Sequence, residues 1–268
     1  MKFDSKKIGD IEYIYPYKNK YVDSTITDLK NNKFDNANKI RHFISGRMTN
    51  QDYVVDVGCH IGLTSLWIAN YQARINKVIA IDGSTQAVEC LKESIVRNNL
   101  SNIEPIQAVV SHSNFKCSFH KNVHNQNVIR QPVRWYAKAL ASYLQHDTTR
   151  TLDEIIGDKT CSFISIDVNG HESAVLTGAV QILERDRPVL LIAYNSNLGT
   201  MGHTIDTIYD LDYEPYYLDQ FNGNVGSQTK TLIPVVTACT DCGEGYFLCY
   251  PSADPKYGLY VDTRKVSE

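Results

Sequence analysis

The side chains best suited to chemistry in the first half of the chain stand where a short apolar run ends. Residues 53–55 lead into Asp56, Gly58 and Gly62 follow, and a helical pattern opens at Leu63. This order predicts a buried strand, a tight glycine turn and the start of a helix. Glycine suits position 58 because the backbone must bend sharply there and leave room for a ligand. The free N–H groups at the start of the helix would point at that ligand.

The charge at this turn indicates which kind of ligand it could hold. A carboxylate at Asp56 would repel a pyrophosphate, and the spacing is not the G-x-G-x-x-G of a dinucleotide-binding turn. It would attract an ammonium or a sulfonium, and S-adenosylmethionine carries both cations. The next apolar run, Lys77–Ile81, ends at Asp82, where a carboxylate can accept hydrogen bonds from a ribose diol. The alternative is an ordinary βαβ unit whose glycines only form turns.

Composition limits the classes of protein that fit. The chain has 268 residues, of which 43% are hydrophobic and 21% charged, and its net charge is −3. These values predict a soluble protein with a substantial core and give no electrostatic reason to expect a nucleic acid partner. We see no apolar run of membrane-spanning length and no signal peptide, and the seven scattered cysteines are typical of reduced thiols. We therefore expect a cytoplasmic protein without a membrane span. The lone C-x-x-C at Cys239 and Cys242 does not by itself predict a zinc site.

Strand and helix patterns alternate along the chain, which predicts an α/β fold with helices on both sides of a parallel sheet. Residues 1–50 are expected to form an extension packed on one domain at 51–268, with an insertion around 113–150. Beyond the first strand and turn, we expect strands at 11–17, 77–81, 103–110, 115–119, 162–168, 189–194 and 246–250, and helices at 36–47, 85–100, 134–146, 151–156, 171–186 and 205–212.

The insertion is the least regular part of the sequence. Ser111 and His112 end the third expected strand, where an adenine edge could be read. Long insertions near strand ends often build substrate pockets, although a surface decoration is an equal alternative. Residues 114–138 hold five cations and two histidines, which could meet the phosphates of a nucleotide-sugar or a charged glycan. The aromatic residues Tyr13, Tyr15, Tyr17, Trp135 and Tyr136 could stack on a sugar ring or simply belong to the core.

Five segments together resemble one known family. They are VVDVGCHIGLTSLWIA (54–69), VIAIDGSTQAVECLKESIVRNNL (78–100), TLDEII (151–156), FISIDVNGHESAVLTGA (163–179) and RPVLLIAY (187–194). With them the chain resembles the FkbM-type methyltransferases, a branch of the class I S-adenosylmethionine-dependent enzymes. The resemblance implies a Rossmann-like three-layer sandwich, with a mostly parallel seven-stranded sheet and an antiparallel last strand. It also implies O-methylation, commonly of sugar or natural-product hydroxyls.

The sequence departs from the family's usual pattern at a few positions. His60 stands where Asn is usual, Asp82 and Gly83 stand where Glu-Pro is usual, Asn169 replaces Glu, and His112 stands where Asp is common. We nevertheless predict cofactor contacts from the turn and from the ends of the first three strands. The residues are Asp56, Gly58, Cys59, His60, Ile61, Gly62, Asp82, Gly83, Ser84, Val109 and Ser111.

The candidate catalytic residues are Asp167, His171 and Glu172, which follow the fourth strand. A hydroxyl acceptor needs a base, so His171 or Asp167 could take its proton while Glu172 orients its neighbour. Alternatively, His171 could bond backbone, and Glu172 could stabilise the dipole of the helix that follows. Asp167 and Glu172 could instead hold a divalent cation, although none is predicted.

The leading prediction is an S-adenosylmethionine-dependent O-methyltransferase acting on a hydroxyl of a sugar, a glycan or a related small molecule. A methyltransferase acting on RNA or protein is one alternative. A catalytically inactive cofactor-binding partner subunit is another.

Overall fold

The computed structural model describes residues 2–20, 22–23, 26–27, 52–71, 75–121, 127–130, 145–195, 198–217, 233–234 and 244–252. Within them the chain forms β1 (Phe3–Ile8), β2 (Ile11–Pro16), β3 (Tyr53–Val57), α3 (Leu63–Tyr71), β4 (Lys77–Asp82), α4 (Thr85–Arg97), β5 (Ile103–Gln107), β6 (Val109–Val110), β7 (Lys116–Lys121), β8 (Asn127–Arg130), β9 (Gln145–Arg150), α5 (Leu152–Ile156), β10 (Cys161–Ile166), α6 (Glu172–Thr177), α7 (Val180–Asp186), β11 (Val189–Asn195), α8 (Met201–Asp210), β12 (Tyr213–Tyr217), β13 (Ile233–Pro234) and β14 (Glu244–Pro251).

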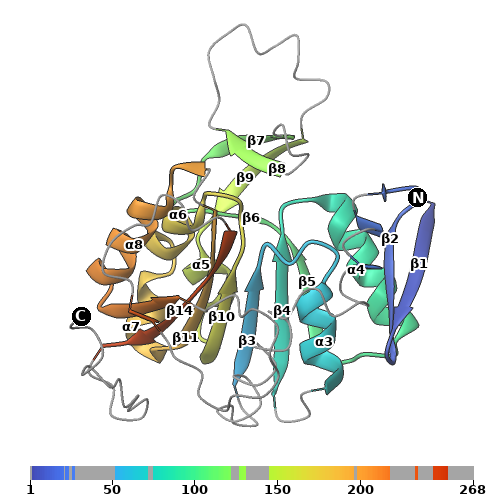
Figure 1. Cartoon of the computed structure of the whole chain (residues 1–268), viewed down its shortest axis with the longest axis horizontal. Helices are drawn as coiled ribbons and strands as arrows, with labels where there is room; N and C mark the ends of the chain where they lie inside the picture. The colour runs from blue at the N-terminus through green and yellow to red at the C-terminus, as the bar shows by residue number, and fades with distance from the viewer. Residues whose placement is uncertain are drawn as a thin grey trace, which may run out of the picture.

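The central sheet has the strand order β13-β12-β14-β11-β10-β3-β4-β5 (Figure 1). The five strands β11, β10, β3, β4 and β5 run parallel to one another. The last strand, β14, is antiparallel to both β11 and β12. This confirms the predicted architecture of seven mostly parallel strands with an antiparallel last strand. The two-residue β13 adds a short eighth strand at one edge. Pro105 lies in β5 and cannot donate a hydrogen bond within the sheet, which is tolerated because β5 is the edge strand on the other side.

Alternate side chains of the strands build two separate cores. Val54 and Val78 belong to one core with Leu66 of α3 and Leu91 of α4. Val55, Val57, Ile79 and Ile81 face the opposite side of the sheet, where α5, α6, α7 and α8 supply the apolar partners. The two-residue period of a strand therefore places one helix layer on each side of the sheet. None of the helices in the described ranges is long and apolar enough to cross a membrane.

The third expected strand does not continue straight through residues 103–110. It ends at Gln107, and Val109 and Val110 form β6, which pairs in parallel with β9. A second sheet of order β6-β9-β7-β8 begins there and stands beyond the carboxyl end of β5 (Figure 1). The hairpin predicted to open at Phe115 is present as β7 and β8. The predicted helix 134–146 is wrong at its end, because Gln145 and His146 lie in β9. Its earlier residues lie outside the described ones, as does the expected helix 36–47.

The helix expected over residues 171–186 is divided into α6 and α7 at Gly178 and Ala179. A Cβ on Gly178 would lie 2.1 Å from the carbonyl oxygen of Ser111, so the chain passes very close to β6 at this point. Asp153 stabilises the start of α7, because its two carboxylate oxygens accept the N–H groups of Gln181 and Ile182. The close packing of Gly178 against Ser111 therefore divides a helix that the apolar spacing of the sequence predicts to be continuous.

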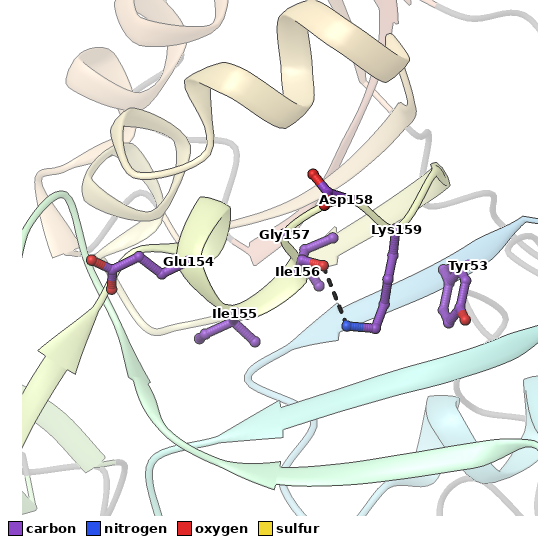
Figure 2. A pocket seen from close by; sticks show the side chains of 7 residues that line it. All are labelled: Tyr53, Glu154, Ile155, Ile156, Gly157, Asp158 and Lys159. Atoms are coloured by element: carbon purple, nitrogen blue, oxygen red, sulfur yellow. Dashed lines mark hydrogen bonds between the residues drawn. The ribbon is translucent and has the colours of Figure 1, made fainter.

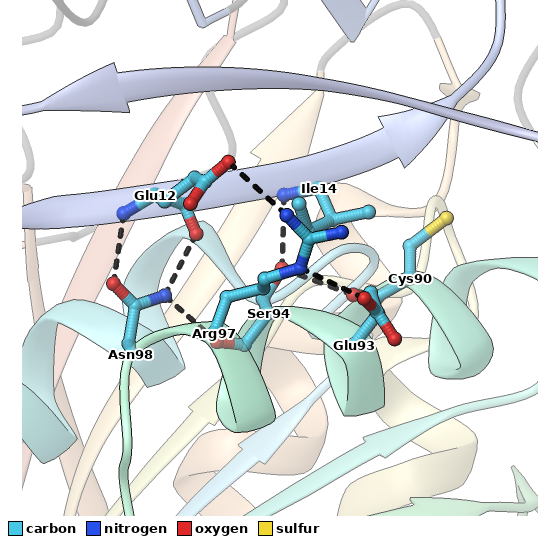
Figure 3. A network of polar contacts seen from close by, with 7 residues as sticks. All are labelled: Glu12, Ile14, Cys90, Glu93, Ser94, Arg97 and Asn98. Atoms are coloured by element: carbon cyan, nitrogen blue, oxygen red, sulfur yellow. Dashed lines mark hydrogen bonds and ion pairs between the residues drawn. The ribbon is translucent and has the colours of Figure 1, made fainter.

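The β1–β2 hairpin packs on α4 through a small set of polar contacts (Figure 3). The side chain of Asn98 donates to the carbonyl of Glu12 at 2.7 Å and accepts its N–H at 2.8 Å. The buried Ser94 hydroxyl accepts the N–H of Ile14 and donates to the carbonyl of Cys90. Tyr13 and Tyr15 are buried in this region, which places them in the core.

We expect Asn98→Ala to lower the free energy of unfolding by about 2 kcal/mol, because two backbone groups of β2 lose their partners at roughly 1 kcal/mol each. Urea denaturation followed by circular dichroism measures the change.

The neighbouring Arg97→Ala is the matched control. Arg97 makes only half-exposed ion pairs, to Glu93 and Glu12, which contribute less than about 1 kcal/mol. Equal losses in the two variants would contradict a special role for the Asn98 contacts.

Candidate active site

The polar residues singled out in the sequence lie along one edge of the central sheet, where the parallel strands end. Asp56 lies near the end of β3, and Asp82 is the last residue of β4. Ser111 follows β6, and Asp167 follows β10. In open α/β sheets this carboxyl edge is where ligands bind.

The glycine turn after β3 is held by its neighbours on both sides. The N–H groups of Gly58 and Cys59 both donate to the carbonyl of Ile81, at 2.8 and 3.1 Å. Gly58 has φ +85°, and a Cβ there would lie 1.9 Å from the carbonyl oxygen of Asp167. The sequence predicts glycine here to admit a ligand. The structure adds a stronger requirement, because β3 must pass against the backbone that follows β10.

The second glycine of the turn also has a packing reason. Gly62 has φ +83°, and a Cβ there would lie 2.4 Å from a methyl carbon of Leu91 in α4. The sequence predicts that Gly62 lets the new helix pack close to its own strand. The structure shows a close contact between the start of α3 and α4. His60, between the two glycines, also has a positive φ, of 51°.

Asp82 organises the backbone around this turn. One carboxylate oxygen accepts the N–H of His60 at 2.9 Å, and the other accepts the N–H of Ser84 at 2.7 Å. Desolvation raises the pKa of this carboxyl group, although those two hydrogen bonds oppose the shift. Each oxygen keeps a second lone pair, so the carboxylate could still accept hydroxyl donors.

Asp56 is buried and accepts a hydrogen bond from the hydroxyl of Ser65 in α3. Burial raises its pKa from 3.8 to about 6, hydrogen bonds from Ser65 and Ser165 lower it, and the charges of Asp167 and Asp82 raise it further. The sheet edge therefore gathers carboxylates that repel one another.

His171 makes a different contact from either one expected. Its Nε2 lies 2.9 Å from the hydroxyl oxygen of Ser111, which is buried and also lies 3.3 Å from Nδ1 of His112. Desolvation lowers the pKa of His171, and the nearby His112 lowers it further. A lowered pKa keeps this imidazole neutral at pH 7, the form that can accept a proton.

Glu172 contacts the loop that precedes it and not a catalytic neighbour. One carboxylate oxygen accepts the N–H groups of Val168 and Gly170, at 3.2 and 3.0 Å. Its side chain is buried, and desolvation raises its pKa. This carboxylate fixes the loop that carries Asn169, whose φ is +55°.

Asp167 has a partner that sequence reasoning missed. The hydroxyl of Tyr246, in β14, donates to its carboxylate at 3.3 Å. The two residues are far apart in the sequence, and β14 reaches this edge only because it lies beside β11. No local pattern around Tyr246 could have revealed the contact.

The remaining predicted residues contribute mainly through their backbone. Ile61 and Val109 are buried in the core, and so is the thiol of Cys59, whose pKa is raised by burial. The carbonyl of Gly83 accepts from the side chain of Gln107, at 3.1 Å. The sequence favours Ser84 or Thr85 as the N-cap of this helix. Ser84 is the N-cap of α4, and its hydroxyl accepts the N–H of Ala87.

The residues at this edge fit a cationic nucleoside. Asp56, Asp82 and Asp167 are close enough for their charges to act on one another, and a ligand with a positive charge would relieve that repulsion. A dinucleotide would add phosphate charges to the same place. Within the described part of the chain, no group of three or more His, Cys, Asp or Glu residues is arranged to hold a metal ion.

An open hollow lies at the end of the sheet where the parallel strands begin. It is lined by Tyr53 and residues 154–159 (Figure 2). Tyr53 is the first residue of β3, so this hollow is at the amino end of the strand. The amino group of Lys159 donates to the carbonyl of Ile156. The hollow contains none of the predicted site residues and belongs to the other end of the molecule.

Comparison with known proteins identifies a family for this chain. The family described as the methyltransferase FkbM domain matches residues 56–215, which is more than half of the chain. No curated protein matches. The match spans all the predicted catalytic residues and the glycine turn.

Several solved structures resemble this chain at low sequence identity. Methyltransferase FkbM from Methylobacillus flagellatus is 16% identical over 76% of this chain, with a TM-score of 0.48, and this chain spans only 44% of its length. TYW2 from M. jannaschii, solved with AdoMet, is 12% identical over 92% of this chain and 84% of its own, with a TM-score of 0.45. An rRNA methylase from Streptococcus thermophilus is 12% identical over 79% of this chain and 93% of its own, with a TM-score of 0.43.

The family match and the order of the central sheet place the chain among methyltransferases of the class I type. The chain belongs to the FkbM methyltransferase family.

The raised pKa of Asp56 predicts a specific pH dependence of stability. Because the folded pKa is about 6 and the ordinary value is 3.8, the folded state binds the proton more tightly. The contribution of Asp56 is therefore fully favourable below about pH 4 and is lost as the pH rises through about 6, by up to roughly 3 kcal/mol. We expect Asp56→Asn to gain stability relative to the wild type between about pH 4.5 and 7.5.

Urea denaturation at the two pH values measures this difference. Asp158→Asn, at an exposed position, controls for the loss of one negative charge. A gap between Asp56→Asn and the wild type that stays constant with pH would contradict the argument.

Proposed function

We propose that the chain transfers the methyl group of S-adenosylmethionine to a hydroxyl of a sugar, a glycan or a related small molecule. The observation that carries the proposal is the contact between His171 and Ser111, beside the carboxylate-lined turn of an FkbM-family domain. A neutral imidazole at that position is a base suited to an alcohol, which is poorly nucleophilic at neutral pH.

Asp82 and Asp56 are the residues proposed to hold the cofactor. Asp82 would accept hydrogen bonds from the ribose hydroxyls through its remaining lone pairs. The backbone of the Gly58–Gly62 turn would lie beside the nucleoside. Asp56 and Asp167 would supply negative charge toward the cationic part of the ligand. When bound, S-adenosylmethionine supplies an electrophilic methyl group on a sulfonium, with a neutral thioether as the leaving group.

The protein's own work is mainly to bind and orient. Because the leaving group is good, most of the rate enhancement comes from placing the acceptor oxygen in line, and such proximity can supply about 7–11 kcal/mol. His171 takes the hydroxyl proton at a ring nitrogen, and Ser111 holds the ring in place from the buried side. Glu172 acts as a positioning residue, since its carboxylate holds the loop before α6.

The proton could in principle go to Asp167 instead, but its surroundings favour His171. Asp167 contributes to the repulsion among the carboxylates at the turn and accepts a hydrogen bond from Tyr246. Such a group is better suited to neutralising a cation than to deprotonating an alcohol. We therefore assign it an electrostatic role.

The proposal extends to the organisation and location of the chain. Residues 1–50 would be an extension packed on a methyltransferase domain at 51–268, supported by the contacts of the β1–β2 hairpin with α4. A cytoplasmic location is supported by the free, buried thiols among the described cysteines. The net charge of −3 favours a small acceptor over RNA.

Titration calorimetry with S-adenosylhomocysteine tests the cofactor assignment. We expect the wild type to bind in the micromolar range and Asp82→Ala to bind about tenfold or more weakly, because hydrogen bonds to a charged partner are lost.

Asp153→Ala is the matched control for this titration. Asp153, like Asp82, accepts two backbone N–H groups, but those groups start α7 and not the glycine turn. The control should lose stability and keep its affinity. If the wild type does not bind S-adenosylhomocysteine, the proposed activity is wrong.

Replacement of the proposed base tests the chemistry. We expect His171→Ala to reduce kcat about 100-fold or more while the affinity for S-adenosylhomocysteine stays within about twofold. Transfer from labelled donor to a sugar identified by screening gives the rate. His203→Ala, at an exposed position of α8, should keep full turnover. Unchanged turnover in His171→Ala would remove the catalytic role.

A further inference from the structure

The hydroxyl of Ser111 is buried between two histidines. Its oxygen lies 2.9 Å from Nε2 of His171 and 3.3 Å from Nδ1 of His112. Ser111 is 0% exposed, His171 is half-buried and His112 is exposed. The three side chains therefore form a hydrogen-bonded chain that begins at the candidate base and ends at an imidazole in solvent.

The hydroxyl proton of Ser111 can point only at one of these two rings. A hydroxyl donates one hydrogen bond and accepts through two lone pairs. In the described part of the chain, the two imidazole nitrogens are the only hydrogen-bond partners of this side chain. The N–H of Ser111 is used separately, because it donates to the carbonyl of Arg150. A buried donor without a partner is destabilising, so the proton must be directed at His112 or at His171.

Two arrangements of the protons satisfy this chain. In the first, the Nε2–H of His171 donates to the Ser111 oxygen, and the hydroxyl donates to Nδ1 of His112. In the second, both bonds run the other way, and the hydroxyl donates to Nε2 of His171. A neutral imidazole carries one N–H, so the first arrangement leaves a lone pair on Nδ1 of His171 and the second puts a proton there. Only the first lets Nδ1 take a proton from an acceptor hydroxyl.

The surroundings of His171 favour the first arrangement. The separation of 2.9 Å is the usual length of an N–H···O bond. His171 is the N-cap residue of α6, but its side chain makes no capping hydrogen bond. Among the described residues its Nδ1 has no partner, so a proton on that nitrogen would have no acceptor in the free protein. A lone pair there is available to a hydroxyl of the acceptor.

His112 is held where it can accept the Ser111 proton. Its ring packs on that of Phe115, with the centroids 5.4 Å apart. Its Cα would lie 3.3 Å from a Cβ on Gly178, so the chain after α6 passes close to its backbone. Because His112 is exposed, its Nε2–H can donate to water while Nδ1 stays unprotonated.

We propose that His112 is a positioning residue for methyl transfer. By accepting the hydroxyl proton of Ser111, it makes the Ser111 oxygen the acceptor for the Nε2–H of His171. This fixes the tautomer of His171 in which Nδ1 is the base. The ring nitrogen that is protonated in a histidine is set by the hydrogen bond that the other makes, and here the second bond reaches one residue further, to His112.

The proton and the methyl group are then both accounted for. The O–H bond of the acceptor breaks and its proton goes to Nδ1 of His171. The acceptor oxygen bonds to the methyl carbon as the carbon–sulfur bond breaks, and the sulfur keeps that electron pair. The imidazolium afterwards gives its proton to water. This inference rests on the proposed function for the reaction, but the tautomer of His171 can be measured in the protein alone.

Nitrogen NMR of the protein with isotope-labelled histidine measures the tautomer without any ligand. Protonated and unprotonated ring nitrogens have very different chemical shifts, and the signals missing from His171→Ala identify those of His171. We expect His171 to carry its proton on Nε2 in the wild type at neutral pH. In His112→Ala the Ser111 hydroxyl loses its acceptor and turns to Nε2, so the proton of His171 should move to Nδ1.

Two further variants separate the hydrogen bond from other effects of the substitution. The amide oxygen of asparagine accepts hydrogen bonds as Nδ1 does, so His112→Asn should keep the wild-type tautomer. Ser113→Ala changes the exposed neighbour in the same loop and should also leave the tautomer unchanged.

Turnover should follow the tautomer. We expect His112→Ala to lower kcat about tenfold or more, while KM and the affinity for S-adenosylhomocysteine stay within about twofold. His112→Asn should keep kcat within about threefold of the wild type. The double variant Ser111→Ala/His112→Ala should be no slower than Ser111→Ala, because His112 acts only through Ser111.

Three results would overturn the inference. The first is a proton on Nδ1 of His171 in the wild type. The second is an unchanged tautomer in His112→Ala. The third is an equal loss of kcat in His112→Asn and His112→Ala, which would mean that the bond to Ser111 is not what matters.

The S-adenosylhomocysteine titration separates this inference from the proposed function. If that compound does not bind, the methyltransferase activity is wrong, whereas the NMR result for His112 and His171 stands by itself. If it binds and the tautomer does not depend on His112, only the inference about His112 fails.

Discussion

The close approach of Gly58 to the backbone of Asp167 is the constraint on which the site depends. At this point β3 and β10 lie side by side, and the N–H of Asp167 donates to the carbonyl of Val57 at 2.9 Å. The N–H of Gly58 donates in the opposite direction, to Ile81 at the end of β4. The ends of three strands are thus joined through two successive residues, Val57 and Gly58. Any Cβ at position 58 would have to move the backbone that carries Asp167.

This junction explains why unfavourable charges can persist there. Asp56, Asp82 and Asp167 are fixed by the backbone of three adjacent strands, so they cannot move apart to reduce their repulsion. Hydrogen bonds from Ser65, His60 and Ser84 offset part of the cost. Strain of this kind is typical of a site prepared for a ligand of opposite charge.

The second half of the site depends on a different close approach, that of Gly178 to Ser111. It interrupts the helix after His171 and brings β6 next to α6, so that the Ser111 hydroxyl meets the imidazole. The same β6 strand pairs with β9 and so begins the small sheet beside the central one. The candidate base is therefore positioned by one short segment, residues 109–112.

The sequence by itself determined the elements that depend on local pattern. The strands β3, β4, β10 and β11, the N-cap at Ser84 and the glycine turn were all predictable, because apolar period, capping residues and glycines act over a few residues. The carboxylates at the strand ends were predictable for the same reason, since parallel strands bring their carboxyl ends to one edge. Only the tertiary structure decided the contacts of His171 with Ser111, of Tyr246 with Asp167, and of Glu172 with its own loop. It also decided the break at Gly178 and the turn of β6 away from the central sheet. These features arise where segments distant in the sequence meet. The periodicity of apolar residues within one segment does not predict which other segment will pack against it.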